Sequence, residues 1–197
     1  MGRSGGRRIA LVVAGVAAVA ASGCVGATDR DDFESEVESR GGGFSEDVVS
    51  DAVDGIAEEV GTEDFELTQL TVSPLTPVVS AQVRDPRAPD QLDDYTFRGD
   101  DLVDVAPVRV AAGTDIDAET LPIAAFAVDQ LDEVVDVALD EFGATDGYAT
   151  SVRLSVEPSA GGTLEPQGTI VVSVESPRAA ATVRFTADGE LVGVDPQ

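Results

Sequence analysis

The order of hydrophobic periodicities along the chain constrains its fold more than any other sequence feature. From Ser45 to Val60 apolar residues recur every four positions, which is typical of a helix with one buried face: Val48, Ala52, Ile56 and Val60. Ser45 is a favoured N-cap, and Gly61 is a favoured helix-ending residue. The pattern then changes to the alternation of strands, over 65–72, 78–84, 95–97 and 102–105.

The second half of the chain shows the same order. Leu121 to Phe142 is predicted to be a longer helix that ends at Gly143, with one apolar stripe formed by Val128, Leu131, Val135, Ala138 and Phe142. Strands are predicted over 152–156, 170–174, 181–185 and 191–194.

The two halves also align in sequence. VSAQVRDPR (79–87) aligns with IVVSVESPR (170–178), and TFRGDDLVDVAP (96–107) aligns with RFTADGELVGVDP (184–196) with one gap. We therefore predict an α+β fold of two repeated units, 44–112 and 118–197, each with one helix followed by about four antiparallel strands.

The last hairpin carries a family resemblance. Val183 to Val194 reads V-R-F-T-A-D-G-E-L-V-G-V, in which Asp188-Gly189 is typical of a tight hairpin turn. A helix followed by strands with this hairpin resembles PepSY-like and β-lactamase-inhibitor-like repeats. The resemblance covers the second half best, because the first half has Gly99-Asp100-Asp101 at the corresponding turn. It implies a non-catalytic envelope module that binds or inhibits a partner.

The N-terminus is typical of an exported protein. Arg3, Arg7 and Arg8 precede the apolar segment 9–21, which is shorter than the roughly 20 residues of a membrane-spanning helix. Ala21-Ser22-Gly23-Cys24 follows and resembles the lipobox of bacterial lipoproteins, although Ala21 stands where leucine is usual. The resemblance implies a signal peptide over 1–23, cleavage between Gly23 and Cys24, and a lipid on Cys24. Arg7-Arg8 leaves both the general and the twin-arginine export routes open.

Residues 24–43 are predicted to form a flexible tether that ends in three glycines. Phe33 and Val37 are four positions apart, so a short recognition helix for a partner is the alternative. The expected location is the outer face of the cell membrane, where the lipid holds the protein.

Composition limits the partners and the source. The chain has a net charge of −26, and removal of 1–23 takes away three arginines and no acid, so the mature chain is more acidic still. This charge disfavours nucleic acids and anionic lipid headgroups and favours basic partners. All twelve basic residues are arginines, which is typical of an actinobacterium, with a haloarchaeon as the alternative.

Residue types exclude most catalytic mechanisms. The chain has no histidine, no lysine and a single cysteine, so Ser-His, Cys-His and Schiff-base chemistry and His/Cys zinc sites lack their residues. We predict that the protein is not an enzyme and needs no cofactor or metal. The acid groups Asp93-Asp94, Asp100-Asp101 and Asp115-Ile116-Asp117 do not have EF-hand spacing and are interpreted as turn and cap residues.

We therefore expect a membrane-anchored cell-envelope lipoprotein that acts as a binding or interaction module. Its partner would be an envelope protein, a polymer or a lipid ligand. The alternative is a carrier of a hydrophobic ligand, based on the long apolar stripe of 121–142. A carrier would leave a cavity beside this stripe, whereas a module would bury the stripe in its core.

Overall fold

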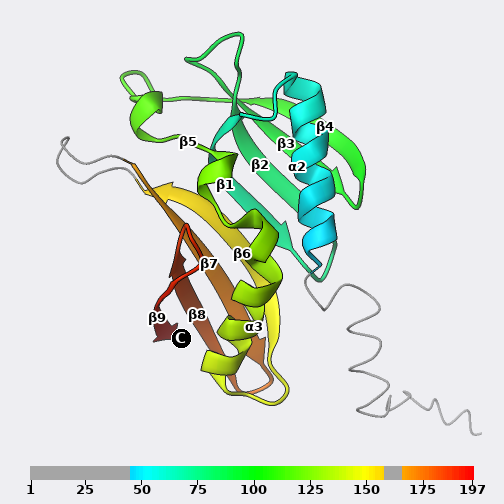
Figure 1. Cartoon of the computed structure of the whole chain (residues 1–197), viewed down its shortest axis with the longest axis vertical. Coiled ribbons are helices and arrows are strands. Elements are labelled where there is room, and N and C mark those ends of the chain that lie inside the picture. Colours follow the sequence, from blue (N-terminus) through cyan, green and yellow to red (C-terminus); the bar gives the residue numbers. More distant parts are fainter. Residues whose placement is uncertain (1–44, 158–165) are drawn as a thin grey trace, which may run out of the picture.

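The computed structural model describes residues 45–157 and 166–197, which fold around a nine-stranded antiparallel sheet (Figure 1). The strands are β1 (Glu66–Ser73), β2 (Val78–Arg84), β3 (Leu92–Arg98), β4 (Asp101–Val108), β5 (Leu121–Pro122), β6 (Tyr148–Glu157), β7 (Gln167–Ser176), β8 (Ala179–Thr186) and β9 (Leu191–Pro196). Their spatial order is β4-β3-β2-β1-β6-β7-β8-β9, and the short β5 pairs with β1.

The prediction of two repeated units, each one helix followed by about four antiparallel strands, is wrong. The first strands of the two halves pair with each other, so that Leu70 lies opposite Leu154 and Val72 opposite Val152 in one sheet. Strand alternation predicts which face of a strand is buried, but it does not predict the neighbouring strand. Pairing of β1 with β6 gives both of these strands a partner on each side and leaves β4 and β9 as the outer strands of the sheet.

Helix α2 (Glu46–Val60) packs across the β4-to-β1 part of the sheet. Ser45 is its N-cap residue but makes no side-chain capping hydrogen bond, and Gly61 ends the helix with a φ of 81°. Gly55 allows the close approach to the sheet, because a Cβ built there would lie 2.6 Å from Cε1 of Phe97 in β3.

Helix α3 spans Leu131–Phe142, so it begins ten residues later than the predicted 121. Residues 121–130 form β5 and short 3₁₀ turns instead. Pro122 cannot donate within a helix, and the backbone amides of Ile123 and Ala127 donate to the carbonyls of Phe65 and Ala187, respectively. These bonds hold the segment against the sheet in a non-helical course.

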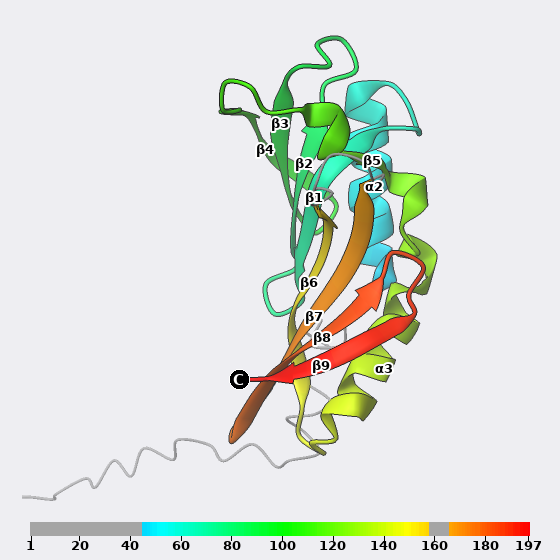
Figure 2. The same cartoon turned by 90° about the vertical axis from the view of Figure 1, so that its left-hand side faces the viewer.

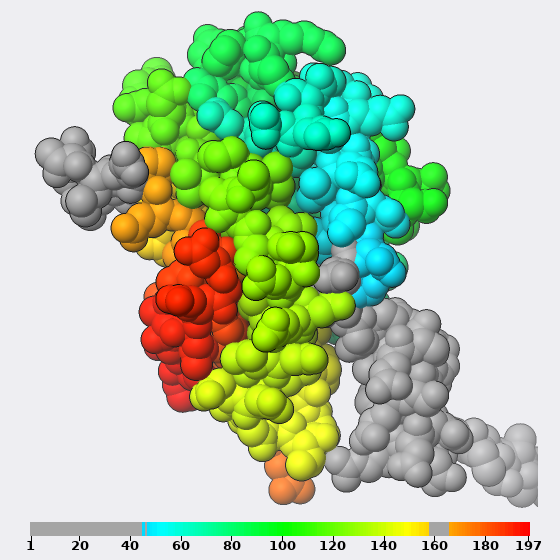
Figure 3. Space-filling model, viewed as in Figure 1, coloured from blue at the N-terminus to red at the C-terminus, as the bar shows by residue number. Residues whose placement is uncertain are grey.

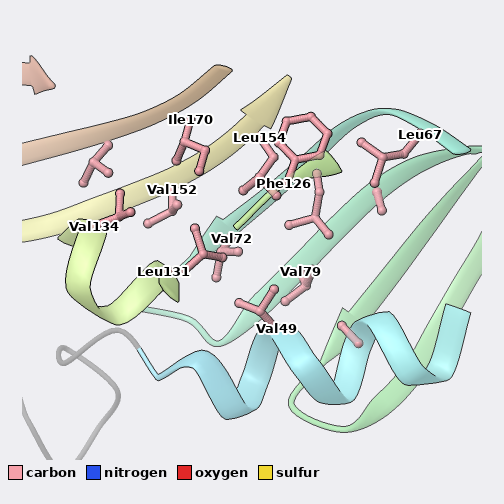
Figure 4. Packing of buried hydrophobic residues seen from close by; sticks show 14 of the residues in the cluster. Val49, Leu67, Val72, Val79, Phe126, Leu131, Val134, Val152, Leu154 and Ile170 are labelled. Carbon is pink, nitrogen blue, oxygen red and sulfur yellow. The ribbon is translucent and has the colours of Figure 1, made fainter. Parts of the chain in front are cut away.

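Both helices cover the same face of the sheet, and one apolar cluster lies beneath them (Figures 2 and 4). Val49 of α2 and Leu131 and Val134 of α3 point towards side chains of the central strands, such as Leu154 and Ile170. The cluster is continuous across the β1–β6 junction, which explains why the two halves form one core.

The opposite face of the sheet carries mainly polar side chains. Along one row of register partners, Ser80, Thr71, Arg153 and Arg184 lie on neighbouring strands, with Val171 between the two arginines. Among the described residues, no helix covers this face except within the connection after β4 (Figure 2). We call it the open face. Within 45–157 and 166–197, no helix is long and apolar enough to cross a membrane.

Candidate functional site

The residues predicted to carry the lipid anchor lie outside the described part of the chain. These are Gly23 and Cys24, together with the tether 24–43 and its possible recognition residues Phe33 and Val37. Their predicted roles stay predictions.

The acid groups considered for calcium are dispersed by the fold. Asp93 and Asp94 are consecutive in β3 and therefore point to opposite faces of the sheet. Asp117 accepts a hydrogen bond from Arg84, and Asp115 and Asp117 both line the open hollow beside it. Among the described residues, no cluster of three or more acidic, histidine or cysteine side chains has a metal-binding arrangement.

Arg84, at the end of β2, ties the connection between the two halves to the sheet. Its Nη1 donates to Oε2 of Glu66 and its Nη2 donates to Oδ1 of Asp117, both at 2.6 Å, and its Nε donates to the Pro89 carbonyl at 2.7 Å. The hydrogen bond to Glu66 is the largest cause of a raised pKa of the Arg84 guanidinium.

An open hollow of about 610 Å³ adjoins Arg84 and is lined mainly by residues 110–117. Because two carboxylates already neutralise the guanidinium, this arrangement is not suited to bind an anion. The ion pairs of Arg84 instead hold the chain between β4 and β5 in place.

The apolar stripe considered for a hydrophobic ligand is largely buried. Leu131, Val135 and Ala138 lie in the core, and α3 packs on β6, β7 and β8. A smaller open hollow, of about 330 Å³, lies between α2 and residues 123–129. Its lining includes Val53, Phe126 and, from the stripe, Val128, together with Asp54 and Asp129. Three residues of the stripe are thus used for core packing, whereas Val128 also lines this hollow.

Exposed apolar side chains gather on the two outer strands of the sheet. Of the large hydrophobic residues that are exposed in the described ranges, all but Leu75 lie on β4 or β9: Leu102, Val103, Val105, Leu191 and Val192. Every residue from Asp101 to Val105 is exposed. Unpaired edge strands with apolar side chains are surfaces on which other chains add, and folded proteins normally blunt them.

β4 presents its apolar residues in an irregular register. Leu102 pairs with Phe97 and Val105 pairs with Tyr95, whose rings are buried beneath α2, so both residues lie on the helix-covered face. Val103 is the extra residue of a β-bulge between these pairs. Leu102, Val103 and Val105 are 38%, 50% and 42% exposed, and together we call them the β4 patch (Figure 3 shows β4 in green beside the cyan α2).

Acidic side chains lie on both sides of the β4 patch. On the open face, burial and then the charge of Asp104 raise the pKa of Asp94, so these two carboxylates are near enough to repel each other. On the helix-covered face, burial raises the pKa of Tyr95 and the charges of Asp93 and Glu59 raise it further. On the helix-covered face the charge of Arg87 acts in the opposite direction and lowers the pKa of Tyr95. The edge therefore combines an apolar strip with carboxylates near both faces.

Sequence reasoning missed this patch. It predicted a strand only over 102–105 and assigned no binding residue to it. The signal was present in D-L-V-D-V-A-P, where Leu102 and Val103 are adjacent and break the alternation, and where Pro107 is compatible with an edge strand but not with a central one.

Comparison with known proteins gives a fold likeness. No protein-family model matches the chain, and no curated protein matches it, so the PepSY-like resemblance gains no support. The structure is similar to the crystal structure of a protein from Clostridium difficile 630 that is assigned as a lipoprotein. The TM-score is 0.56 with 11% sequence identity, over 76% of this chain and 92% of that one. At this identity the likeness shows a shared fold.

Proposed function

We propose that this protein is a bacterial lipoprotein of the cell envelope, held to the outer face of the cell membrane by a lipid on Cys24, and that it acts as a non-catalytic binding module. The apolar segment 9–21 and the sequence Ala21-Ser22-Gly23-Cys24 support the anchor. The assignment of the Clostridium difficile protein of similar fold as a lipoprotein is consistent with it.

The observation that supports the binding role best is the β4 patch. Leu102, Val103 and Val105 are exposed on a strand whose outer edge pairs with no other strand in the described part of the chain. Large apolar side chains that cluster on a soluble surface are typical of sites that contact another molecule. The sequence also lacks the histidine, lysine and paired cysteines on which many catalytic sites depend.

The anchor is tested by Cys24→Ser in the native host, with Ser22→Ala as a matched control that keeps the small residues before the cysteine. We expect the Cys24→Ser protein to move from the membrane fraction to the soluble fraction, because the lipid has no other cysteine to which it can attach. Membrane association of the Cys24→Ser protein that survives high salt and alkaline washing would contradict the proposal.

The binding role is tested by a photo-crosslinking amino acid placed at Val103 in intact cells, with a second protein labelled at Val192 of β9. Val192 is 65% exposed and serves as the control for chance encounters. We expect a discrete crosslinked species from position 103 that is absent with Leu102→Asn/Val105→Thr and is not formed from position 192. The same weak adducts from both positions would argue against a partner site on β4.

A further inference from the structure

We propose that β4 binds an extended segment of a partner protein as an added strand, and that this segment alternates arginine or lysine with apolar residues. The inference rests on the proposed binding role and adds the chemistry of the partner. It follows from the backbone, the apolar residues and the charges of this edge, taken in turn.

The backbone of β4 can accept one more strand over a limited stretch. β4 pairs with β3 on one side, and within the described residues no strand pairs with its other side. Pro107 has no N–H and ends the stretch that can continue a ladder, which leaves Asp101–Ala106. A partner adding here would gain main-chain hydrogen bonds, and its side chains would alternate between the two faces of the sheet.

The apolar residues provide contacts for such a segment. Leu102 and Val105 lie on the helix-covered face, where the side chains of an added strand would shield them from water. The exposed Val103 at the bulge adds a third apolar contact. A purely polar segment would leave this patch in contact with water.

The charges determine the sign of the partner. Asp104 lies on the open face near Asp94, and Glu59 and Asp93 lie near Tyr95 on the other face. Cationic side chains on an added strand would face carboxylates whichever way they alternate, because acids occupy both faces. Cations lie near both ends of the edge: Arg98 is opposite Asp101 at the start of β4, and the charge of Arg87 lowers the pKa of Tyr95, the register partner of Val105. Asp104 lies between them.

A second copy of this chain fits the same edge poorly. Two β4 strands placed side by side would bring together two sets of identical acids, and like charges across strands are destabilising. The other outer strand, β9, is also less suitable. Gly193 lies in its middle and Pro196 is its last residue, and Asp195 is paired with Arg184 at 3.2 Å.

The experiment uses the mature lipidated protein in vesicles of neutral phosphatidylcholine, with short fluorescent peptides as probes. One peptide alternates arginine with valine, a second alternates glutamate with valine, and a third is the arginine peptide with a central proline. We expect the arginine peptide to bind at least about tenfold more tightly than either control. Asp104→Lys should reduce the preference for the arginine peptide over the glutamate peptide, because one of the carboxylates at the edge becomes a cation.

Amide hydrogen exchange identifies the bound strand. With the arginine peptide present, exchange should slow in Asp101–Ala106, whereas Val192→Thr on β9 should leave binding unchanged. Equal binding of the three peptides, an equal loss with Val192→Thr, or a β4-dependent dimer in sedimentation without peptide would each overturn the proposal. If the peptides fail but Val103 still crosslinks to a partner in cells, then the binding role stands and only the partner's chemistry is wrong.

Discussion

Gly55→Ala provides a test of how α2 lies on the sheet. Glycine-to-alanine in an exposed helix interior normally stabilises a protein by about 1 kcal/mol through helix propensity. At Gly55 the new methyl group would lie 2.6 Å from Cε1 and 3.0 Å from Cζ of Phe97. The ring is only 1% exposed and cannot swing into solvent, so it must shift within the core.

Overpacking of this kind costs about 1–3 kcal/mol, and so deep an overlap belongs in the upper part of that range. The cost therefore exceeds the propensity gain, and we expect a net loss of about 1 kcal/mol of unfolding free energy. For a chain of this size, that lowers Tm by roughly 2–4 °C. The assay is thermal unfolding followed by circular dichroism, on the Cys24→Ser background to avoid lipid.

Two variants make this test specific. Ser50→Ala changes an exposed position of α2 and should be neutral or slightly stabilising. In a Phe97→Leu background, where the smaller side chain leaves room, Gly55→Ala should become stabilising, which gives a coupling energy of about 1 kcal/mol or more. An increase in Tm for Gly55→Ala in the otherwise unchanged chain would refute the proposed contact between α2 and β3.

Further predictions concern the charged contacts. Arg84→Gln should lower the unfolding free energy by about 1–2 kcal/mol. This value is smaller than that of two charge-assisted hydrogen bonds because Asp117 is largely exposed. Chemical denaturation measures the loss, and an unchanged free energy would show that Arg84 does not hold the connection between β4 and β5. Asp104→Asn should lower the pKa of Asp94 in an NMR titration by removing the nearby charge, and an unchanged pKa would show that burial alone raises it. Since a raised carboxyl pKa means that the folded state binds the proton more tightly, Asp94 favours folding as pH falls through its folded pKa and opposes it at neutral pH. Asp104→Asn should therefore stabilise the protein slightly at neutral pH and less so in acid.

The sequence predicted most local elements but not their assembly. The positions of α2 and of the six inner strands follow from periodicity, because each has one face against the core, whereas β4 and β9 have no buried residue. The start of α3 was wrong, since the apolar residues of 121–130 are compatible with a helix and their backbone bonds to Phe65 and Ala187 are tertiary. The β1–β6 junction was missed for a similar reason, because nothing in the alternation of either strand specifies the other as its partner.

The candidate site was predictable only in part. The sequence Ala21-Ser22-Gly23-Cys24, which resembles a lipobox, is local and could be found without a structure, whereas the β4 patch depends on which strand lies at the outside of the sheet. Leu102 and Val105 would be buried if β4 had neighbours on both sides. Pro107 was the one residue whose chemistry indicated an edge position before the pairing was known.

The β1–β6 junction also affects how the chain reaches its native state. The two central strands are separated by residues 74–147, about half of the described sequence, so their ladder closes a long loop that costs entropy before it brings any stabilising contact. Until β6 has been synthesised and has paired with β1, the edge of β1 that β6 will occupy is unpaired, and the apolar residues of β1 are incompletely covered. Such a chain is expected to fold slowly and to be vulnerable to aggregation while incomplete. Folding would therefore be most sensitive to holdase chaperones before β6 has paired.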